Sequence, residues 1–279
     1  MKYLVFESED TEGPRTGIEH DGTIIDVTDQ LSGKNDPFAE LLASSVSKGW
    51  SPRAFLESAE GSRYDADALT IKAPLAKSGR LFCLGGAYTS HLEERNRDLF
   101  TVPEQWYVPR SSIVGPDSPI VLPKRIAGQV KPAAELGVVI GEGGRNIDDE
   151  KALDLVAGYT VSNDVTARTD WPGPRGYKIM DTFNPLGPAI TPSTAINNPL
   201  DLDIRMYLDD DTICEGSTRG HRFTISFMIS YMSTIIELRP GDILSTGDPG
   251  GVSGQLMAGR ELITEIESVG TLRNPIVEQ

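Results

Sequence analysis

Short apolar runs of strand length, separated at close intervals by Gly, Pro, Asp and Asn, constrain the fold of this chain more than any other feature. Near the start the runs are MKYLVF, RTGIEH and TIIDVT, and later ones are SIVGPDSPIVLP, AELGVVIG, GYTVSND, LDIRMYL and GDILSTGD. Runs of this length, bounded by turn-forming residues, are typical of β-strands. The sequence therefore predicts an α+β protein in which strands predominate.

Three stretches are expected to be helical, at residues 36–56, 153–157 and 225–238. In the last stretch the apolar residues recur at helical spacing. These residues are Ile225, Met228, Met232, Ile235 and Ile236. The pattern predicts a helix that packs on the sheet, and it indicates no catalytic role.

The length of the chain and a change of pattern near residue 74 indicate two unequal domains. With 279 residues, the chain exceeds the usual size of one domain, about 100 to 200 residues. A connection rich in Pro, Ser and Gly around Pro74 leads into an apolar strand that ends at Gly85 and Gly86. We therefore expect a small α+β domain over residues 1–73 and a larger, mostly β domain over residues 74–279.

The composition argues against several classes of partner. Because 41 acidic residues stand against 26 basic ones, the net charge of -15 would repel nucleic acid and anionic membranes. The two cysteines, Cys83 and Cys214, lie far apart in apolar runs, unlike a disulfide framework or a zinc site. No apolar run approaches the roughly 20 residues of a membrane span, and the first residues do not resemble a signal peptide. We expect a soluble, cytoplasmic protein.

One of the three histidines, His91, stands in a pattern that suggests catalysis. It follows the strand end at Gly85 and Gly86, and Glu94 lies three residues further on. If Ser90 caps a short helix, the His91 and Glu94 side chains share one face and can meet. A carboxylate that orients an imidazole makes a general base for water. A solvated, charged turn would explain the same residues, so both interpretations stay open at this point.

Two carboxylates at expected strand ends could bind a hard cation. Glu135 is the one polar group on its face of the strand in AELGVVIG, and Asp164 ends the run GYTVSND. Mg²⁺ needs only one or two such carboxylates together with water and substrate. Lys178 adds a cation that could neutralise a developing enolate. A surface charge on a strand is the open alternative for Glu135.

Taken in order, these segments resemble the fumarylacetoacetate hydrolase family over essentially the whole chain. The first 29 residues are similar to the small N-terminal domain of that family, and LGGAYTSHLEE is similar to its strand and lid. The segments SSIVGPDSPIVLP, AELGVVIG, GYTVSNDVTAR, KIMDTFNPLGP and LRPGDILSTGDPGG follow in the order of the family.

The resemblance implies a mixed β-roll domain, a homodimer, and an active site under a mobile lid, here near residues 92–108. It also implies Mg²⁺- or Mn²⁺-assisted cleavage of carbon–carbon bonds in 1,3-diketo acids, a reaction of keto acid catabolism. Relatives decarboxylate, tautomerise or dehydrate 2-keto acids. Carried over residue by residue, the resemblance assigns nine roles. His91 and Glu94 would activate water, Glu135 and Asp164 would bind the metal, Lys178 would stabilise the enolate, and Tyr88, Arg168, Thr246 and Asp248 would contact the substrate.

Three positions depart from the pattern of the family. Ala133 stands where the family usually has the first of two glutamates, whose spacing of two aims both at one ion. Asp248 replaces a usual Thr, and Trp171 replaces a frequent Gln. We hypothesise that Asp248 restores the lost charge, either as a ligand through water or as an acid/base group. A turn Asp before Pro249 is the open alternative.

Three functions are consistent with this pattern. The favoured one is a metal-dependent hydrolase with a weakened metal site, because the other site residues persist. The second is a metal-independent decarboxylase, isomerase or dehydratase of a related keto acid. The third is a non-catalytic protein that keeps the fold to bind a ligand.

Overall fold

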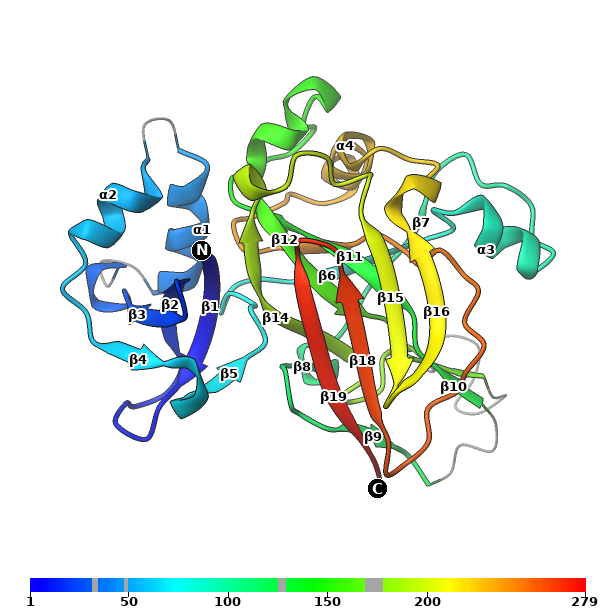
Figure 1. Cartoon of the computed structure of the whole chain (residues 1–279). Coiled ribbons are helices and arrows are strands. Elements are labelled where there is room, and N and C mark those ends of the chain that lie inside the picture. The colour runs from blue at the N-terminus through cyan, green and yellow to red at the C-terminus, as the bar shows by residue number, and fades with distance from the viewer. Residues whose placement is uncertain (32–34, 48–49, 125–128, 169–177) are drawn as a thin grey trace.

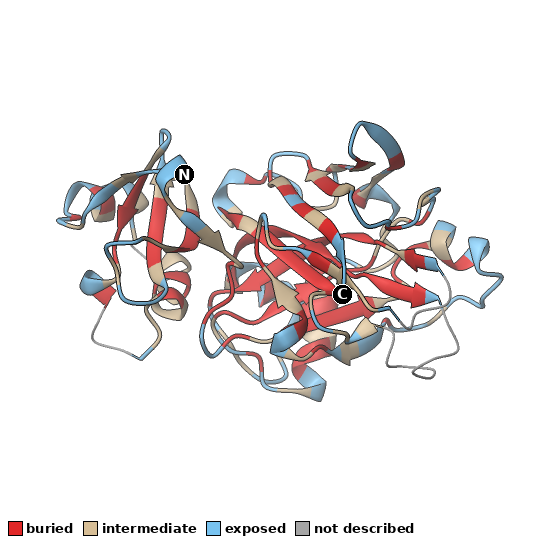
Figure 2. Ribbon diagram, turned by 90° about the horizontal axis from the view of Figure 1, so that it is seen from below, coloured by how far each residue is buried: buried red, intermediate tan, exposed pale blue. Residues whose placement is uncertain are grey.

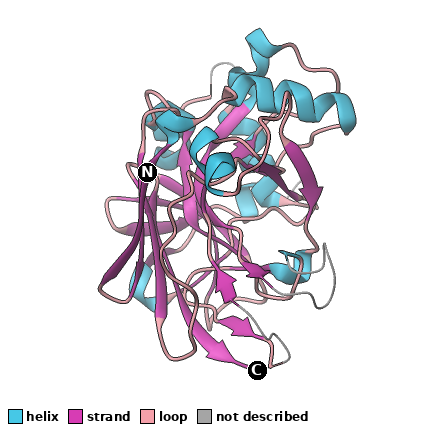
Figure 3. Ribbon diagram, turned by 90° about the vertical axis from the view of Figure 1, so that its right-hand side faces the viewer, coloured by secondary structure: helices cyan, strands magenta, loops and turns pink. Residues whose placement is uncertain are grey.

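The computed structural model describes residues 1–31, 35–47, 50–124, 129–168 and 178–279. In this part of the chain strands predominate, which confirms the predicted class (Figure 1). The strands run through the body of the molecule, and the short helices lie at its periphery (Figure 3). None of the described helices is long and apolar enough to cross a membrane.

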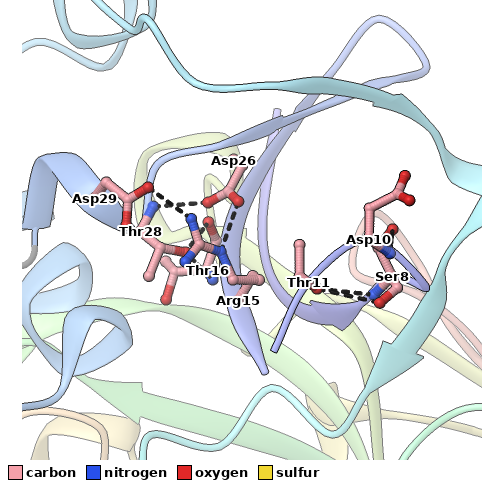
Figure 4. Close-up of polar contacts among 8 residues, drawn as sticks. All are labelled: Ser8, Asp10, Thr11, Arg15, Thr16, Asp26, Thr28 and Asp29. Carbon is pink, nitrogen blue, oxygen red and sulfur yellow. Dashed lines mark hydrogen bonds and ion pairs between the residues drawn. The ribbon is translucent and has the colours of Figure 1, made fainter. Parts of the chain in front are cut away.

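The N-terminal part forms one end of a long sheet. Its elements are β1 (Lys2–Glu7), β2 (Arg15–His20), β3 (Thr23–Asp26), α1 (Pro37–Ser45), α2 (Pro52–Glu57), β4 (Arg63–Asp65) and β5 (Thr70–Lys72). Arg15 binds β2 to the end of β3 and to the segment after it, since it donates to Asp26 (2.7 Å) and Asp29 (2.9 Å) (Figure 4). The turn after β1 is closed by hydrogen bonds between Ser8 and Thr11.

The central strands continue the same sheet. They are β6 (Leu81–Gly85), β7 (Glu104–Tyr107), β8 (Ile113–Val114), β11 (Ala134–Ile140), β12 (Val156–Asn163), β14 (Asn184–Pro192) and β17 (Ile243–Ser245). The strand order is β4-β3-β2-β1-β14-β12-β11-β17-β6-β7, with β5 on β1 and β8 on β14. A two-stranded ribbon pairs β10 (Gln129–Lys131) with β13 (Thr166–Arg168). This ribbon and the ends of β11 and β12 carry much of the site described below.

A second sheet packs against the first around a shared apolar core. Its order is β16-β15-β18-β19-β9. Its strands are β9 (Ile120–Leu122), β15 (Asp203–Leu208), β16 (Asp211–Ser217), β18 (Glu261–Ile266) and β19 (Gly270–Glu278). Two further α-helices of the described residues are α3 (Thr89–Glu94) and α4 (Ile225–Ile235). Figure 2 shows that buried residues follow the strands, whereas exposed residues lie mainly in loops and outer helices.

The predicted helices have different bounds from those expected. The stretch 36–56 holds two helices, because Pro52 begins a new helix with the Ser51 hydroxyl as its cap. The stretch 153–157 is the end of a 3₁₀-helix, Asp149–Leu155, and the start of β12. The helix α4 ends at Ile235 rather than at residue 238, because the Leu238 N–H donates to the Gly144 carbonyl (2.9 Å).

The N-terminal part is joined to the rest of the molecule by both its sheet and its core. The strand β1 pairs with β14, with Tyr3 opposite Ile190. Tyr3 and Phe38 belong to the same buried apolar cluster as Leu81 and Ile190. The domain boundary near residue 74 therefore stays a prediction, since the apolar cluster of the N-terminal part includes residues from beyond this boundary.

Candidate active site

A cavity of about 760 Å³ lies where the ribbon β10–β13, the helix α3, the strand β7 and the loop after β17 meet. Seven of the nine site residues predicted from the sequence line it. They are His91, Glu94, Glu135, Asp164, Arg168, Lys178 and Asp248. Side chains from segments far apart in the chain thus share one space.

One face of a continuous antiparallel ribbon forms the floor of this cavity. Lys131 stands opposite Thr166 in the β10–β13 pair, and Ala134 stands opposite Asn163 in the β11–β12 pair. Counting between these pairs places Ala133 opposite Asp164, and the Asp164 N–H donates to the Ala133 carbonyl (3.0 Å).

Strand alternation explains which side chains reach the cavity. Six residues of one face line it: Lys131, Ala133 and Glu135 on one strand, and Asp164, Thr166 and Arg168 on the other. Their neighbours on the opposite face belong to the apolar core, namely Val130, Ala134, Leu136, Val165 and Ala167.

Glu135 is buried, with only 2% of its surface exposed, so the surface-charge interpretation is wrong. Its Oε2 accepts hydrogen bonds from the Ser245 hydroxyl (2.6 Å) and the Gly247 N–H (2.9 Å). Burial, together with the charges of Asp164 and Asp248, raises the pKa of the Glu135 carboxyl to about 8. The carboxylate is therefore held in place by hydrogen bonds while its charge remains poorly compensated.

Asp164 forms an ion pair with Lys178, and both residues line the cavity. The Lys178 ammonium contacts Asp164 Oδ2 and lies 4.8 Å from the centre of the Trp106 ring. Burial lowers the pKa of Lys178, but the charges of Asp164 and Glu135 outweigh this effect and raise it. Lys178 is therefore a permanent cation. The other oxygen of Asp164, Oδ1, is buried and has no hydrogen-bond partner within the described residues.

His91 lies on α3, and two carboxylates approach the same nitrogen of its ring. Its Nδ1 is 3.3 Å from Asp248 Oδ1 and 3.9 Å from Glu94 Oε2. Burial lowers the pKa of His91, and Asp248 is the largest opposing influence. The imidazole is thereby favoured in its neutral form, which can accept a proton.

Backbone N–H groups of the loop after β17 donate hydrogen bonds to both of these carboxylates. The Gly250 N–H donates to Asp248 Oδ1 (2.9 Å), and the Gly251 N–H donates to Glu94 Oε1 (2.7 Å). A Cβ atom at position 250 would come within 2.8 Å of Glu94 Oε2, so the close approach depends on glycine there. Asp248 is therefore both a turn residue and the carboxylate nearest to His91.

The helix of His91 does not begin as the sequence suggested. The structure has Tyr88 as the N-cap, without a side-chain cap, and the Ser90 hydroxyl donates to the Pro249 carbonyl (2.7 Å) instead. The Ser90 cap was therefore a wrong prediction. This hydrogen bond ties α3 to the loop that carries Asp248.

Two predicted substrate contacts, Tyr88 and Thr246, lie behind the cavity wall. Tyr88 is 1% exposed and Thr246 is fully buried, and neither lines the cavity. Tyr88 packs on the His221 ring (4.2 Å between centroids), and Thr246 Oγ1 donates to the Leu136 carbonyl (3.0 Å). These two side chains therefore do not face the space in which a substrate would lie.

The segment 92–108, which the resemblance to the family suggests is a lid, contributes residues from both of its ends to the lining of the cavity. Arg97 binds Glu104 through two hydrogen bonds of 3.1 Å and stacks on the Phe100 ring. The Phe100 ring covers Gly86, where a Cβ atom would lie 2.3 Å from it. Trp106 and Tyr107 line the cavity. Trp171, the remaining departure from the pattern of the family, lies outside the described residues.

Sequence reasoning missed the residues that support the predicted ones. Ser245 and the Gly247 N–H hold Glu135, and Lys131 faces the cavity. The spacing of two from Lys131 through Ala133 to Glu135 was the available signal, because it places all three residues on one strand face.

The carboxylates suit a hard divalent cation, with the protein supplying two ligands. Glu135 and Asp164 lie on the same ribbon face, and Asp164 Oδ1 is a buried acceptor without a partner among the described residues. A cation there would also offset the burial and the repulsion from Asp164 that raise the pKa of Glu135. Among the described residues, no three His, Cys, Asp or Glu side chains converge on one point that could hold a metal. Water and substrate would complete the coordination.

Comparisons with known proteins agree on one family. The model of the fumarylacetoacetate (FAA) hydrolase C-terminal domain matches residues 80–277. A mitochondrial oxaloacetate tautomerase of Xenopus laevis is 33% identical over 99% of this chain and 90% of its own length. A 2,4-didehydro-3-deoxy-L-rhamnonate hydrolase of Sphingomonas sp. is 33% identical over 100% and 96%, respectively.

A solved structure extends this agreement to three dimensions. The maleylpyruvate hydrolase of Sphingobium sp. SYK-6, determined with manganese(II) and pyruvate, is 27% identical. It superposes with a TM-score of 0.83, covering 100% of this chain and 99% of the other. With the matched domain, the full-length relatives and this superposition in agreement, the chain belongs to the fumarylacetoacetate hydrolase family.

Proposed function

We propose that this chain is an enzyme that cleaves a carbon–carbon bond of a 2-keto or 1,3-diketo acid by hydrolysis. The observation that carries the proposal is the arrangement of His91. A neutral imidazole, flanked by Asp248 and Glu94, faces a cavity whose floor holds the pair Asp164–Lys178. A base and a fixed cation therefore line one substrate-sized space.

The charged residues of the cavity define how the substrate would be held. Lys178 presents a cation toward an oxygen that becomes negative during the reaction. Arg168 presents a planar fork of donors suited to a carboxylate of the substrate. A divalent cation held by Glu135 and Asp164 would polarise the keto oxygens of the substrate.

In this reaction His91 serves as the base that takes a proton from water and as the acid that later returns it. His91 accepts a proton from water, and the oxygen of that water adds to a carbonyl carbon of the substrate. The bond from this carbon to the neighbouring carbon then breaks, and its electron pair leaves as an enolate opposite Lys178. The protonated His91 returns its proton to the enolate carbon. Asp248 and Glu94 stabilise the imidazolium in between.

The lack of a carboxylate at Ala133 favours a second candidate function, the interconversion of keto and enol forms. A glutamate at this position would stand opposite Asp164 and two residues from Glu135, and so would complete a set of three carboxylates. Proton transfer at a carbon beside a carbonyl needs only a base and one stabilising cation, which His91 and Lys178 supply. The oxaloacetate tautomerase from Xenopus laevis gives this candidate further support.

One experiment separates the two candidates. Acetylpyruvate and oxaloacetate are incubated with the protein, with and without Mn²⁺, and the products are followed by proton NMR in D₂O. Hydrolysis converts acetylpyruvate into acetate and pyruvate, whereas tautomerisation only speeds keto–enol exchange and deuterium uptake. The His91→Ala variant is the control for both. If neither substrate changes faster than in this variant, the enzymatic proposal is wrong.

A further inference from the structure

Along the strands that form the floor of the cavity, acidic side chains lie at one end and basic side chains at the other. One end carries the carboxylates Glu135 and Asp164, and the other carries the cations Lys131 and Arg168. Between them lie the small side chains of Ala133 and Thr166, so no large group on the floor separates the two ends.

The ribbon register sets the distance between these ends. Successive residues in an antiparallel strand rise about 3.4 Å, so residues two apart on one face are about 7 Å apart. Lys131 is therefore about 7 Å from Ala133 and about 14 Å from Glu135 along the strand. Arg168 is as far from Asp164 as Lys131 is from Glu135. Since Lys and Arg side chains are long, both cationic groups can reach part of the way back toward the acidic end.

Lys131 has no evident structural partner. Its side chain is half-buried against the cavity, and among the described residues no hydrogen bond or ion pair engages its ammonium. Its neighbours on the strand face are Ala133 and Gln129, and the residue opposite it is Thr166. A partly desolvated cation that faces a cavity is stabilised when an anion binds to it.

We propose that Lys131 is a specificity-determining residue that binds a second, distal carboxylate of the substrate together with Arg168. The inference rests on the proposed function, since it takes the keto-acid head of the substrate to lie at the Lys178 end. It adds that the preferred substrate is a dicarboxylate whose two anionic groups lie at opposite ends of the ribbon floor. A monocarboxylic keto acid of the same length would leave Lys131 without a partner.

Binding of two stable keto acids of equal length tests this assignment. 2-Oxoglutarate and 2-oxopentanoate both have five carbons and differ only by a terminal carboxylate in place of a methyl group. Their affinities are measured by calorimetry in the presence of Mn²⁺ for the wild type, Lys131→Gln and Lys131→Arg. Lys77→Gln, which changes an exposed lysine that does not line the cavity, is the matched control. Circular dichroism and melting temperature establish that each variant is folded.

The wild type is expected to bind 2-oxoglutarate more tightly than 2-oxopentanoate. Lys131→Gln weakens binding of 2-oxoglutarate about tenfold, because a charge-assisted hydrogen bond is lost, and changes binding of 2-oxopentanoate less than about twofold. Lys131→Arg restores the preference, and Lys77→Gln leaves it unchanged.

The two proposals fail in different ways. If the wild type binds both acids equally, or if Lys131→Gln weakens both to the same extent, Lys131 does not read a distal carboxylate, and the proposed function stands. If the wild type binds neither acid, while acetylpyruvate and oxaloacetate also remain unchanged, the proposed function fails and this inference fails with it.

Discussion

Replacing Asp248 with Asn removes the negative charge nearest to the His91 imidazole while keeping the size of the side chain. The two groups are 3.3 Å apart and only 13% of the Asp248 side chain is exposed. Even with the dielectric constant of water, two unit charges at this distance interact by about 1.3 kcal/mol, which corresponds to about one pKa unit. The loss of Asp248 should therefore lower the pKa of His91 by at least about one unit.

The assay is an NMR titration of the histidine side chains in wild type, Asp248→Asn and Glu94→Gln. The His91 signal is assigned by its absence in His91→Ala. Glu94 is farther from His91 (3.9 Å) and 48% of its side chain is exposed, so solvent screens it and the shift in Glu94→Gln is smaller. Because His91 acts as a base in its neutral form, the acid limb of kcat/KM moves to lower pH in Asp248→Asn. An unchanged His91 pKa in this variant, or a larger shift in Glu94→Gln, would refute the assignment.

Three more outcomes follow from the same geometry. His91→Ala should abolish turnover and leave the circular dichroism spectrum unchanged; full activity would remove His91 from the mechanism. Ala133→Glu should tighten Mn²⁺ binding in calorimetry, because the new carboxylate stands opposite Asp164; an unchanged affinity would contradict convergence of the ligands. The pKa of Glu135 is about 8 rather than 4.5, so its contribution to stability is lost as pH rises through this interval. With a chelator present, the melting temperature should fall between pH 5 and pH 8, and Glu135→Gln should flatten that fall; an equal fall in the variant would exclude Glu135 as its source.

Segments with a local signature were predictable from the sequence. The strand runs and their order sufficed for the fold class and the family. The cavity-facing positions of Glu135 and Asp164 follow from alternation along each strand, since the core takes every second side chain. The break before α2 was missed, although Pro52 marks it, because Pro cannot continue a helix from the preceding turn.

Features that depend on contacts between distant segments were not predictable. The hydrogen bond from Ser90 to Pro249 spans 159 residues and replaces the expected cap. Thr246 and Tyr88 are neighbours of site residues in the sequence, but the turn of the chain directs both side chains behind the cavity wall. The homodimer expected from the family resemblance stays a prediction.

The pairing of β1 with β14 has a consequence for handling the protein. The segment that matches the family model begins at residue 80, so a fragment restricted to it would lack β1. The part of β14 around Ile190 would then lose its partner strand and present unpaired N–H and C=O groups, which template association with other chains. Besides β1, the N-terminal residues supply part of the apolar cluster beneath this edge. The small N-terminal part thus covers a strand that would otherwise favour aggregation, although none of its described residues lines the cavity.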